Sequence, residues 1–244
     1  MKAAVTLLSG GLDSTTLAYY LRSKGYREII ALSFDYGQRH KKELRAAQEI
    51  ADLLDAEHHI ITLGVADDGW ATRPLSVLLG KNALTDSAVP VPDGHYAEDN
   101  MKVTVVPNRN AIMLSIAYGV AVARGAELVA FAAHSGDHRI YPDCRPEFVE
   151  ALGRALELGN EWADPLPRIE GPFLNTDKAE IVREASRLQV PFVQTWSCYK
   201  GGDSHCGTCG TCYERREAFE QAGIHDPTPY LDNHTRYAAP AGVE

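Results

Sequence analysis

The chain has 244 residues, of which 45% are hydrophobic and 23% are charged, and it carries a formal net charge of −9. This size and composition suit a soluble globular protein with one α/β domain and a small appendage, and they exclude a disordered or collagen-like chain. No run of about 18 apolar residues occurs, which argues against a transmembrane helix, and the acidic balance argues against a broad basic surface for nucleic acid.

Short apolar segments alternate with helical patterns along most of the chain. Strands are predicted at residues 3–8, 28–34, 58–63 and 127–133, and helices at residues 14–24, 41–54, 110–124, 146–158 and 177–188. Residues 64–106 are rich in Gly, Pro and Asp and indicate a functional loop or lid. The alternation predicts an α/β fold with a Rossmann-like parallel sheet flanked by helices on both sides. We expect an α/β domain at residues 1–190 and a separate C-terminal segment at residues 191–244.

The sequence SGGLDSTT lies between the first predicted strand and the first predicted helix. Two glycines let the backbone approach a ligand closely, and the hydroxyl groups and free N–H groups of a first helical turn bind anions. The pattern matches neither the Walker nor the dinucleotide-binding motif. The alternative is a Gly-Gly turn in which Asp13 or Ser14 merely caps the helix.

Four of the five cysteines lie close together near the C-terminus, at Cys198, Cys206, Cys209 and Cys212. Such spacing can close a tetrahedral zinc site, whereas an iron–sulfur cluster is the alternative. The N-terminus does not resemble a signal peptide, so we expect a cytoplasmic protein with a metal site rather than a disulfide framework. The fifth cysteine, Cys144, is expected to be packed rather than nucleophilic.

The loop SGGLDS resembles the pyrophosphate loop of the N-type ATP pyrophosphatases, in which the pattern is S-G-G-x-D-S. The resemblance implies an adenine nucleotide alpha hydrolase-like fold and cleavage of ATP between the α and β phosphates, which activates a substrate oxygen as its adenylate. It implies that ATP is bound by Leu8, Ser9, Gly10, Gly11, Leu12, Asp13, Ser14, Thr15, Thr16, Leu17 and Ala18.

Further motifs resemble one branch of that superfamily, the 7-cyano-7-deazaguanine synthases of queuosine precursor biosynthesis. They span nearly the whole chain in the family's order: SGGLDSTT, FDYGQRH, VPNRN, YPDCRPEF, TDKAEIV, TWSCYKGG, CGTCGTCYER and AGIHDPT. The resemblance implies ATP, free ammonia and 7-carboxy-7-deazaguanine as substrates, a structural Zn²⁺ and a homodimer. The carboxylate would become first an amide and then a nitrile, because adenylation turns each departing oxygen into part of a good leaving group.

Roles within the site follow from that scheme. Asp13 is predicted to help position Mg²⁺, and Arg109 and Lys178 to stabilise charge on the leaving pyrophosphate. The alternatives are a solvated lysine for Lys178 and a surface ion pair for Arg109. Six residues are predicted to contact the nucleotide or the deazapurine: Tyr36, Gln38, His40, Tyr141, Asp143 and Arg145. Among these, Arg145 is the predicted partner of the substrate carboxylate, and Asp143 could equally cap a helix.

One segment departs from the family pattern. The family places a segment like Asn-x-x-Asp-Tyr-Ser-Gly before YPDC, whereas this chain has HSGDHRI at residues 134–140. His134 and His138 are therefore interpreted either as substrate or acid–base groups or as hydrogen-bonded loop histidines. The departure leaves open a related ligase that activates a different carboxylate. A tRNA-modifying enzyme and a zinc module without turnover are further alternatives, and the charge of −9 argues against the former.

Overall fold

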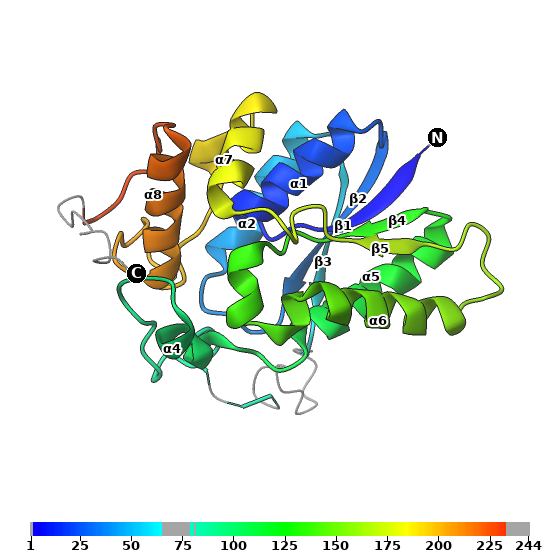
Figure 1. Ribbon diagram of the computed structural model, residues 1–244, viewed down its shortest axis with the longest axis horizontal. Coiled ribbons are helices and arrows are strands. Elements are labelled where there is room, and N and C mark those ends of the chain that lie inside the picture. The colour runs from blue at the N-terminus through cyan, green and yellow to red at the C-terminus, as the bar shows by residue number, and fades with distance from the viewer. Residues whose placement is uncertain (1, 65–78, 81, 233–244) are drawn as a thin grey trace, which may run out of the picture.

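The computed structural model describes residues 2–64, 79–80 and 82–232 (Figure 1). The predicted lid at residues 64–106 therefore lies partly outside the described residues, and so do residues 233–244 of the predicted C-terminal segment. The proposed division at residue 190 stays a prediction.

Five parallel strands form one sheet in the order β3-β2-β1-β4-β5. The strands are β1 (Ala3–Leu7), β2 (Glu28–Asp35), β3 (Glu57–Thr62), β4 (Leu128–Ala130) and β5 (Arg168–Glu170). The central strands are buried on both faces and read as continuous apolar runs, which is why the sequence revealed them. The sequence did not reveal β5, because it has only three residues and follows Pro165 and Pro167 closely.

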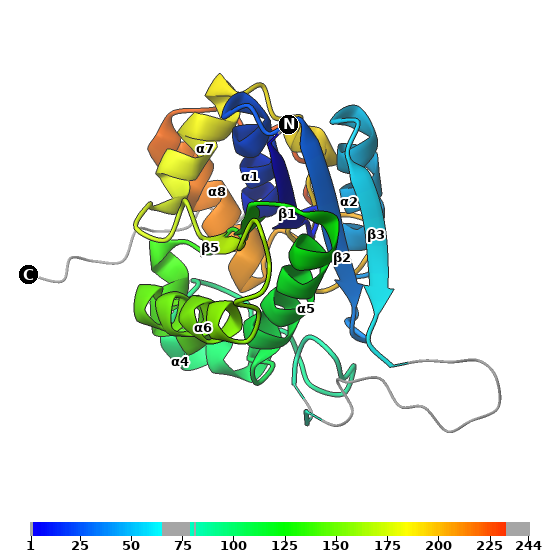
Figure 2. The same cartoon turned by 90° about the vertical axis from the view of Figure 1, so that its right-hand side faces the viewer.

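Helices cover both faces of the sheet, as predicted. In Figure 1, α1 (Leu12–Ser23) and α7 (Lys178–Arg187) lie above the sheet, and α5 (Arg109–Arg124) and α6 (Pro146–Leu158) lie below it. Alternate strand residues divide accordingly: Val5 and Leu32 share a core cluster with Leu114 of α5, and Ala4 shares one with Leu17 of α1. Figure 2 shows α2 (Lys42–Leu53) beside β2 and the edge strand β3.

The remaining elements are short, apart from one helix. They are α4 (Glu98–Met101), η1 (Lys102–Thr104), η2 (Ser135–Arg139), η3 (Pro142–Cys144) and η4 (Phe192–Gln194). The helix α8 (Gly210–Ala222) lies beside α7 in Figure 1, and its Phe219 packs against Val182 of α7. The sequence pattern predicts no helix there, because α8 starts inside the cysteine motif with Gly210 and lacks a simple apolar stripe.

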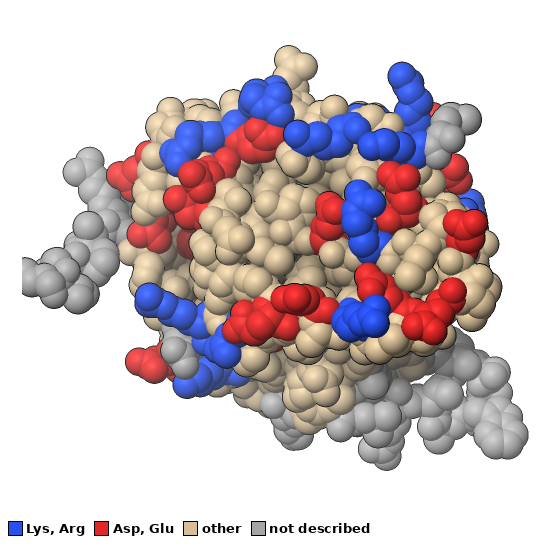
Figure 3. All heavy atoms as spheres, turned by 45° about the vertical axis from the view of Figure 1, so that its right-hand side comes forward, with Lys and Arg blue, Asp and Glu red and all other residues tan. Residues whose placement is uncertain are grey.

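Charges on the surface are mixed. On the face drawn in Figure 3, acidic and basic side chains are interspersed, and no continuous basic surface is present. Within the described part of the chain, no helix has the length and apolar character that crossing a membrane would require.

Candidate active site

A hollow opens at the carboxyl ends of β1, β2 and β4. The chain runs from β1 outward to β3 and then returns to the other side of β1, so the strand order reverses at β1 and β4. Open α/β sheets bind ligands at this reversal. The hollow measures about 1270 Å³ with the open space at its mouth included. We call it the pocket. Its wall comes from the loop after β1, the residues after β2 and β4, the first turns of α5, α7 and α8, Tyr96, and residues within 196–199.

The loop after β1 leaves the start of α1 without a side-chain cap. Gly11 is the N-cap residue and no side chain accepts a hydrogen bond from the N–H groups of the first turn, so the capping alternative for Asp13 and Ser14 is wrong. Ser9 and Ser14 instead bond to each other, with 3.0 Å between their Oγ atoms, and the Ser9 N–H donates to the Ser14 Oγ at 3.1 Å. Free N–H groups at a helix start can bind an anion, and this loop leaves those groups available.

Gly10 allows this loop to pack closely on α2. Its φ is +77°, and a Cβ atom there would clash with the backbone of α2 at Glu43 and Ala47. The Gly10 carbonyl accepts the backbone N–H of Trp196 at 2.8 Å, which ties the TWSC motif to the loop. A side chain at position 10 would therefore displace the loop.

Six of the eleven residues predicted to hold ATP line the pocket: Leu8, Ser9, Gly11, Leu12, Asp13 and Ser14. The other five are not part of its wall: Gly10, Thr15, Thr16, Leu17 and Ala18. These five residues are buried behind the loop and in α1. Within α1, the Thr16 hydroxyl donates a hydrogen bond to the Leu12 carbonyl at 2.7 Å.

A cluster of charges surrounds Lys178 on the pocket wall. The Lys178 Nζ donates to the Asp13 Oδ2 at 2.7 Å and to the Glu214 Oε2 at 3.0 Å, and its side chain is 17% exposed. The alternative of a solvated lysine is therefore wrong. Burial lowers the pKa of Lys178, but Asp13 and Glu214 outweigh it and raise that pKa well above the usual value. Lys178 is consequently a permanent cation at neutral pH.

The two carboxylates of this cluster differ in their protonation. Burial raises the pKa of Asp13, but the charge and hydrogen bond of Lys178, together with His134 and Arg215, outweigh burial and hold that pKa below its usual value. Burial raises the pKa of Glu214 above its usual value, although Lys178 opposes the shift. Of these two carboxylates, Glu214 therefore takes up a proton more readily than Asp13.

His134 joins the cluster from the segment that departs from the family pattern. Its Nδ1 accepts the Gly136 N–H at 3.1 Å, so the proton of the neutral ring is on Nε2. That Nε2 lies 3.5 Å from the Glu214 Oε1 and 3.6 Å from the Asp137 Oδ2. Asp137 also accepts the Tyr96 hydroxyl at 3.2 Å. The departing segment therefore orients carboxylates on the pocket wall, whereas His138 does not line the pocket.

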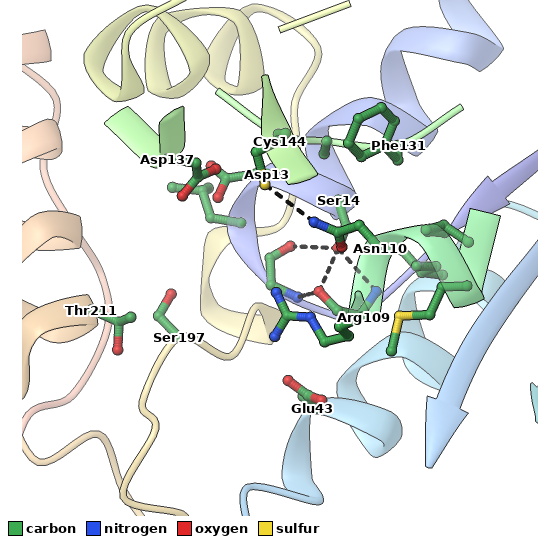
Figure 4. A pocket seen from close by; sticks show the side chains of 18 of the residues that line it. Asp13, Ser14, Glu43, Arg109, Asn110, Phe131, Asp137, Cys144, Ser197 and Thr211 are labelled. Carbon is green, nitrogen blue, oxygen red and sulfur yellow. Dashed lines mark hydrogen bonds between the residues drawn. The ribbon is translucent and has the colours of Figure 1, made fainter. Parts of the chain in front are cut away.

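The other end of the pocket is aromatic. Tyr36, Tyr141 and Tyr199 line it together with His40, whose ring stacks on Tyr199 with 5.0 Å between the centroids. Arg109 extends from the start of α5 into this part of the pocket (Figure 4), and its guanidinium lies 5.8 Å from the Tyr141 ring centroid. Burial raises the pKa of Tyr36 to about 12, so its hydroxyl stays neutral.

Three residues predicted to contact substrate are absent from the pocket wall. The Gln38 side chain bonds to the Phe34 carbonyl at 2.8 Å and braces the turn after β2. The Asp143 Oδ2 accepts the Asn110 N–H at 3.0 Å at the start of α5. The Arg145 Nε donates to the His138 carbonyl at 2.8 Å. The side chains of all three are thus hydrogen-bonded to backbone groups and do not line the pocket.

Several pocket residues have no role in the sequence analysis: Tyr96, Asn110, Tyr199, Thr211 and Glu214. Glu214 lies two residues after Cys212 within the quoted motif CGTCGTCYER, so its position was the available signal. Cys144 is buried beside the pocket, where the Asn110 Nδ2 donates to its Sγ at 3.2 Å (Figure 4). Burial raises the pKa of Cys144, which agrees with a packed thiol.

The four clustered cysteines converge. The sulfur atoms of Cys198, Cys206, Cys209 and Cys212 lie within 4.8 Å of one another. A tetrahedral zinc with Zn–S bonds of about 2.3 Å needs sulfurs about 3.8 Å apart, and the Cys206 and Cys212 Sγ atoms are 3.9 Å apart. An iron–sulfur cluster places its thiolates on separate irons and spreads them further. The donor set and its size therefore fit a single zinc ion.

Comparison with known proteins identifies a family model and relatives that match nearly the whole chain. Residues 3–223 match the family model described as "Queuosine biosynthesis protein QueC". A Brucella ovis protein named 7-cyano-7-deazaguanine synthase is 53% identical over 234 residues, which cover 95% of this chain and 94% of that protein. A Ruegeria protein of the same name is 51% identical over 247 residues, with 100% of this chain and 99% of that protein covered.

Solved structures resemble the chain more distantly. The NMN synthetase of Francisella tularensis is 16% identical with a TM-score of 0.46, covering 91% of this chain and 77% of that one. A U34-tRNA thiolase from Methanococcus maripaludis is 15% identical with a TM-score of 0.45, covering 91% and 72%. The match to the family model and the identity to both relatives extend over nearly the full length, and the chain belongs to the QueC family of queuosine biosynthesis proteins.

Proposed function

We propose that this chain is a ligase that uses ATP and ammonia to convert 7-carboxy-7-deazaguanine into 7-cyano-7-deazaguanine. The observation that carries the proposal is the charged cluster of Asp13, Lys178 and Glu214 beside the uncapped start of α1. This arrangement provides an anion site, a permanent cation and a carboxylate of raised pKa in one pocket. The names of relatives more than 50% identical over nearly full length support the substrate assignment.

The reaction proceeds through two activations of the same carbon. A carboxylate oxygen attacks the α-phosphorus of ATP, pyrophosphate leaves, and ammonia displaces AMP to form the amide. A second ATP adenylates the amide oxygen, and loss of AMP and protons yields the nitrile. We assign the phosphates to the loop and the start of α1, and the developing negative charge to Lys178.

Two metal ions belong to this proposal. The Asp13 Oδ1 is buried and has no hydrogen-bond partner among the described residues, and Glu214 is a second oxygen donor nearby. These hard donors fit Mg²⁺, which neutralises phosphate charge when bound. We assign Zn²⁺ to the four cysteines as a structural ion. A homodimer, a cytoplasmic location and the absence of nucleic-acid binding complete the proposal.

The test is formation of the nitrile by purified, zinc-loaded protein. With 7-carboxy-7-deazaguanine, ATP, Mg²⁺ and ammonium, mass spectrometry should detect first the amide and then the nitrile. The Lys178→Met variant should lower kcat roughly 100- to 1000-fold, since it removes the cation at the leaving group. The Lys24→Met variant, at the exposed end of α1, is the matched control and should retain the wild-type rate. Failure of the wild-type protein to form the nitrile would refute the proposal.

A further inference from the structure

Arg109 differs from Lys178 in having no anionic partner. Among the described residues, no carboxylate oxygen lies within 4.0 Å of its guanidinium nitrogens. Asp143 acts on it electrostatically, but the Asp143 Oδ2 already accepts the Asn110 N–H. Burial raises the pKa of the neighbouring Tyr36, Tyr141 and Tyr199, so these groups are neutral and do not balance the charge. A guanidinium on a pocket wall without a counter-ion indicates a site for an anionic ligand group.

The phosphates of ATP already have a site at the other end of the pocket. The loop after β1 and the start of α1 offer hydroxyl and N–H groups, and Lys178 supplies the charge. The adenine ring is neutral, and apolar side chains of Leu8, Leu32 and Leu44 line the pocket on the side of β2 and α2. Bound ATP therefore provides no counter-ion for the Arg109 guanidinium. The anionic group that pairs with Arg109 must come from the second substrate.

We propose that Arg109 receives the carboxylate of the deazaguanine acid and afterwards the oxygen of the amide intermediate. This inference deepens the proposed function and rests on it. Tyr36 and Tyr141 provide flat walls on which a bicyclic heteroaromatic ring can pack beside the guanidinium. Arg145, the partner that the sequence analysis predicted, is engaged by the His138 carbonyl and does not line the pocket.

The chemistry of a guanidinium suits both halves of the reaction. It only donates hydrogen bonds, and both the carboxylate and the amide present an oxygen that accepts them. One carboxylate oxygen on Arg109 leaves the other free to attack the α-phosphorus. The nitrile has no oxygen and no charge at that carbon. Arg109 therefore holds each species that must be adenylated and loses its contact when the product forms.

The experiment measures binding of three deazaguanines that differ only at this carbon. Isothermal titration compares the 7-carboxy, 7-carboxamide and 7-cyano compounds on the wild-type protein and on Arg109→Met. A charge-assisted hydrogen bond predicts a loss of roughly 10- to 100-fold in affinity for the acid, a smaller loss for the amide, and less than about threefold for the nitrile. Affinity for ATP should be unchanged, which also shows that the variant is folded.

Further variants keep the test decisive. Arg109→Lys retains a point charge and should recover part of the affinity for the acid, and it replaces Arg109→Met if that variant does not fold. Arg154→Met removes an arginine that is 66% exposed on α6 and should bind all three compounds as the wild type does. In steady-state assays Arg109→Met should raise the KM for the acid and leave the KM for ATP unchanged.

Other binding results would refute either the role of Arg109 or the proposed function. Equal losses for acid and nitrile would show a structural role for Arg109, and a selective loss of ATP affinity would place a phosphate there, as the sequence analysis predicted. Either result refutes the inference. If the wild-type protein binds none of the three compounds, the proposed function fails as well.

Discussion

Arg215 illustrates how single residues hold the pocket wall in place. It is 1% exposed, and its guanidinium bonds to the Asp226 carboxylate, to the Thr195 Oγ1 at 2.7 Å and to the Ser197 Oγ at 3.2 Å. Ser197 lines the pocket. Removal of one partner from a buried ion pair leaves the other charge uncompensated. Asp226→Asn should therefore lower the free energy of unfolding by about 3–5 kcal/mol, measured by urea denaturation of zinc-loaded protein at pH 7.

The pH dependence of this effect has a defined sign. Burial raises the pKa of Asp226, but Arg215 and the hydrogen bonds from Tyr230 and Thr228 together outweigh burial and lower that pKa below the ordinary 3.8. The ionised carboxylate thus stabilises the fold above pH 3.8, and this contribution is lost as pH falls through the folded-state pKa. The difference in the free energy of unfolding between wild type and Asp226→Asn should be constant near neutral pH and should become smaller below pH 3.8. Asp203→Asn is the control and should change stability far less, because the Asp203 carboxylate is fully exposed in its ion pair with Lys42. A difference that widens in acid would contradict this assignment.

At this scale the sequence predicts residue types better than their partners. Asp13, Arg109 and Lys178 all line the pocket, because their motifs follow strands or begin helices at the ligand-binding edge. Gln38 and Arg145 lie in equally persuasive motifs, yet backbone carbonyls engage them. The geometry of each turn decides which side chains form hydrogen bonds with backbone groups. A single sequence does not show that geometry.

The helix α8 connects the cysteine cluster to the pocket. It begins directly after Cys209, which is its N-cap residue, and it contains both Cys212 and the pocket residues Thr211 and Glu214. The segment before α4 is hydrogen-bonded to the cysteine segment, since the Gly94 N–H donates to the Thr208 carbonyl at 2.9 Å, and Tyr96 of the same segment donates to Asp137 of η2. The cysteine segment therefore contacts both α8 and the residues before α4.

This arrangement predicts that the metal site controls order in α8. Cys206→Ser should lose bound zinc, measured as metal per chain, because a hydroxyl is a much weaker ligand than a thiolate. Amide hydrogen exchange at the start of α8 and at residues 92–101 should then increase, whereas β1 and β2 should stay protected. Cys144→Ser, outside the cluster, is the control and should keep the zinc. Retained zinc, bound iron, or unchanged exchange in α8 would each count against this account.

Elements with strong periodicity were predictable, and those fixed by tertiary contacts were not. The helix predicted at residues 177–188 is observed as α7, and the capping box of Asp177 and Glu180 at its start forms both of its hydrogen bonds. By contrast, β5 depends on pairing with β4, and α8 depends on the cysteines and on packing against α7. Such elements carry little local signal, because their stability comes from neighbours distant in sequence.

For the whole molecule, the topology predicts where the chemistry takes place. The alternation of strands and helices predicted a parallel sheet covered on both faces, and the loop after β1 lies where the strand order reverses. The location of the pocket was therefore predictable from the order of elements. Its composition was not, since α5, η2 and α8 contribute residues from distant parts of the chain. Long-range packing brings these together, and motif spacing does not reveal it.

The central claim is that ATP activates the acid and then the amide at their oxygens, and the fate of those oxygens tests it most directly. Wild-type protein is given 7-carboxy-7-deazaguanine labelled with ¹⁸O in both carboxylate positions, together with ATP, Mg²⁺ and ammonium. Mass spectrometry should find two AMP molecules per nitrile, each carrying one ¹⁸O in its phosphate. Label in inorganic phosphate or water instead of AMP, or one AMP per nitrile, would contradict the account.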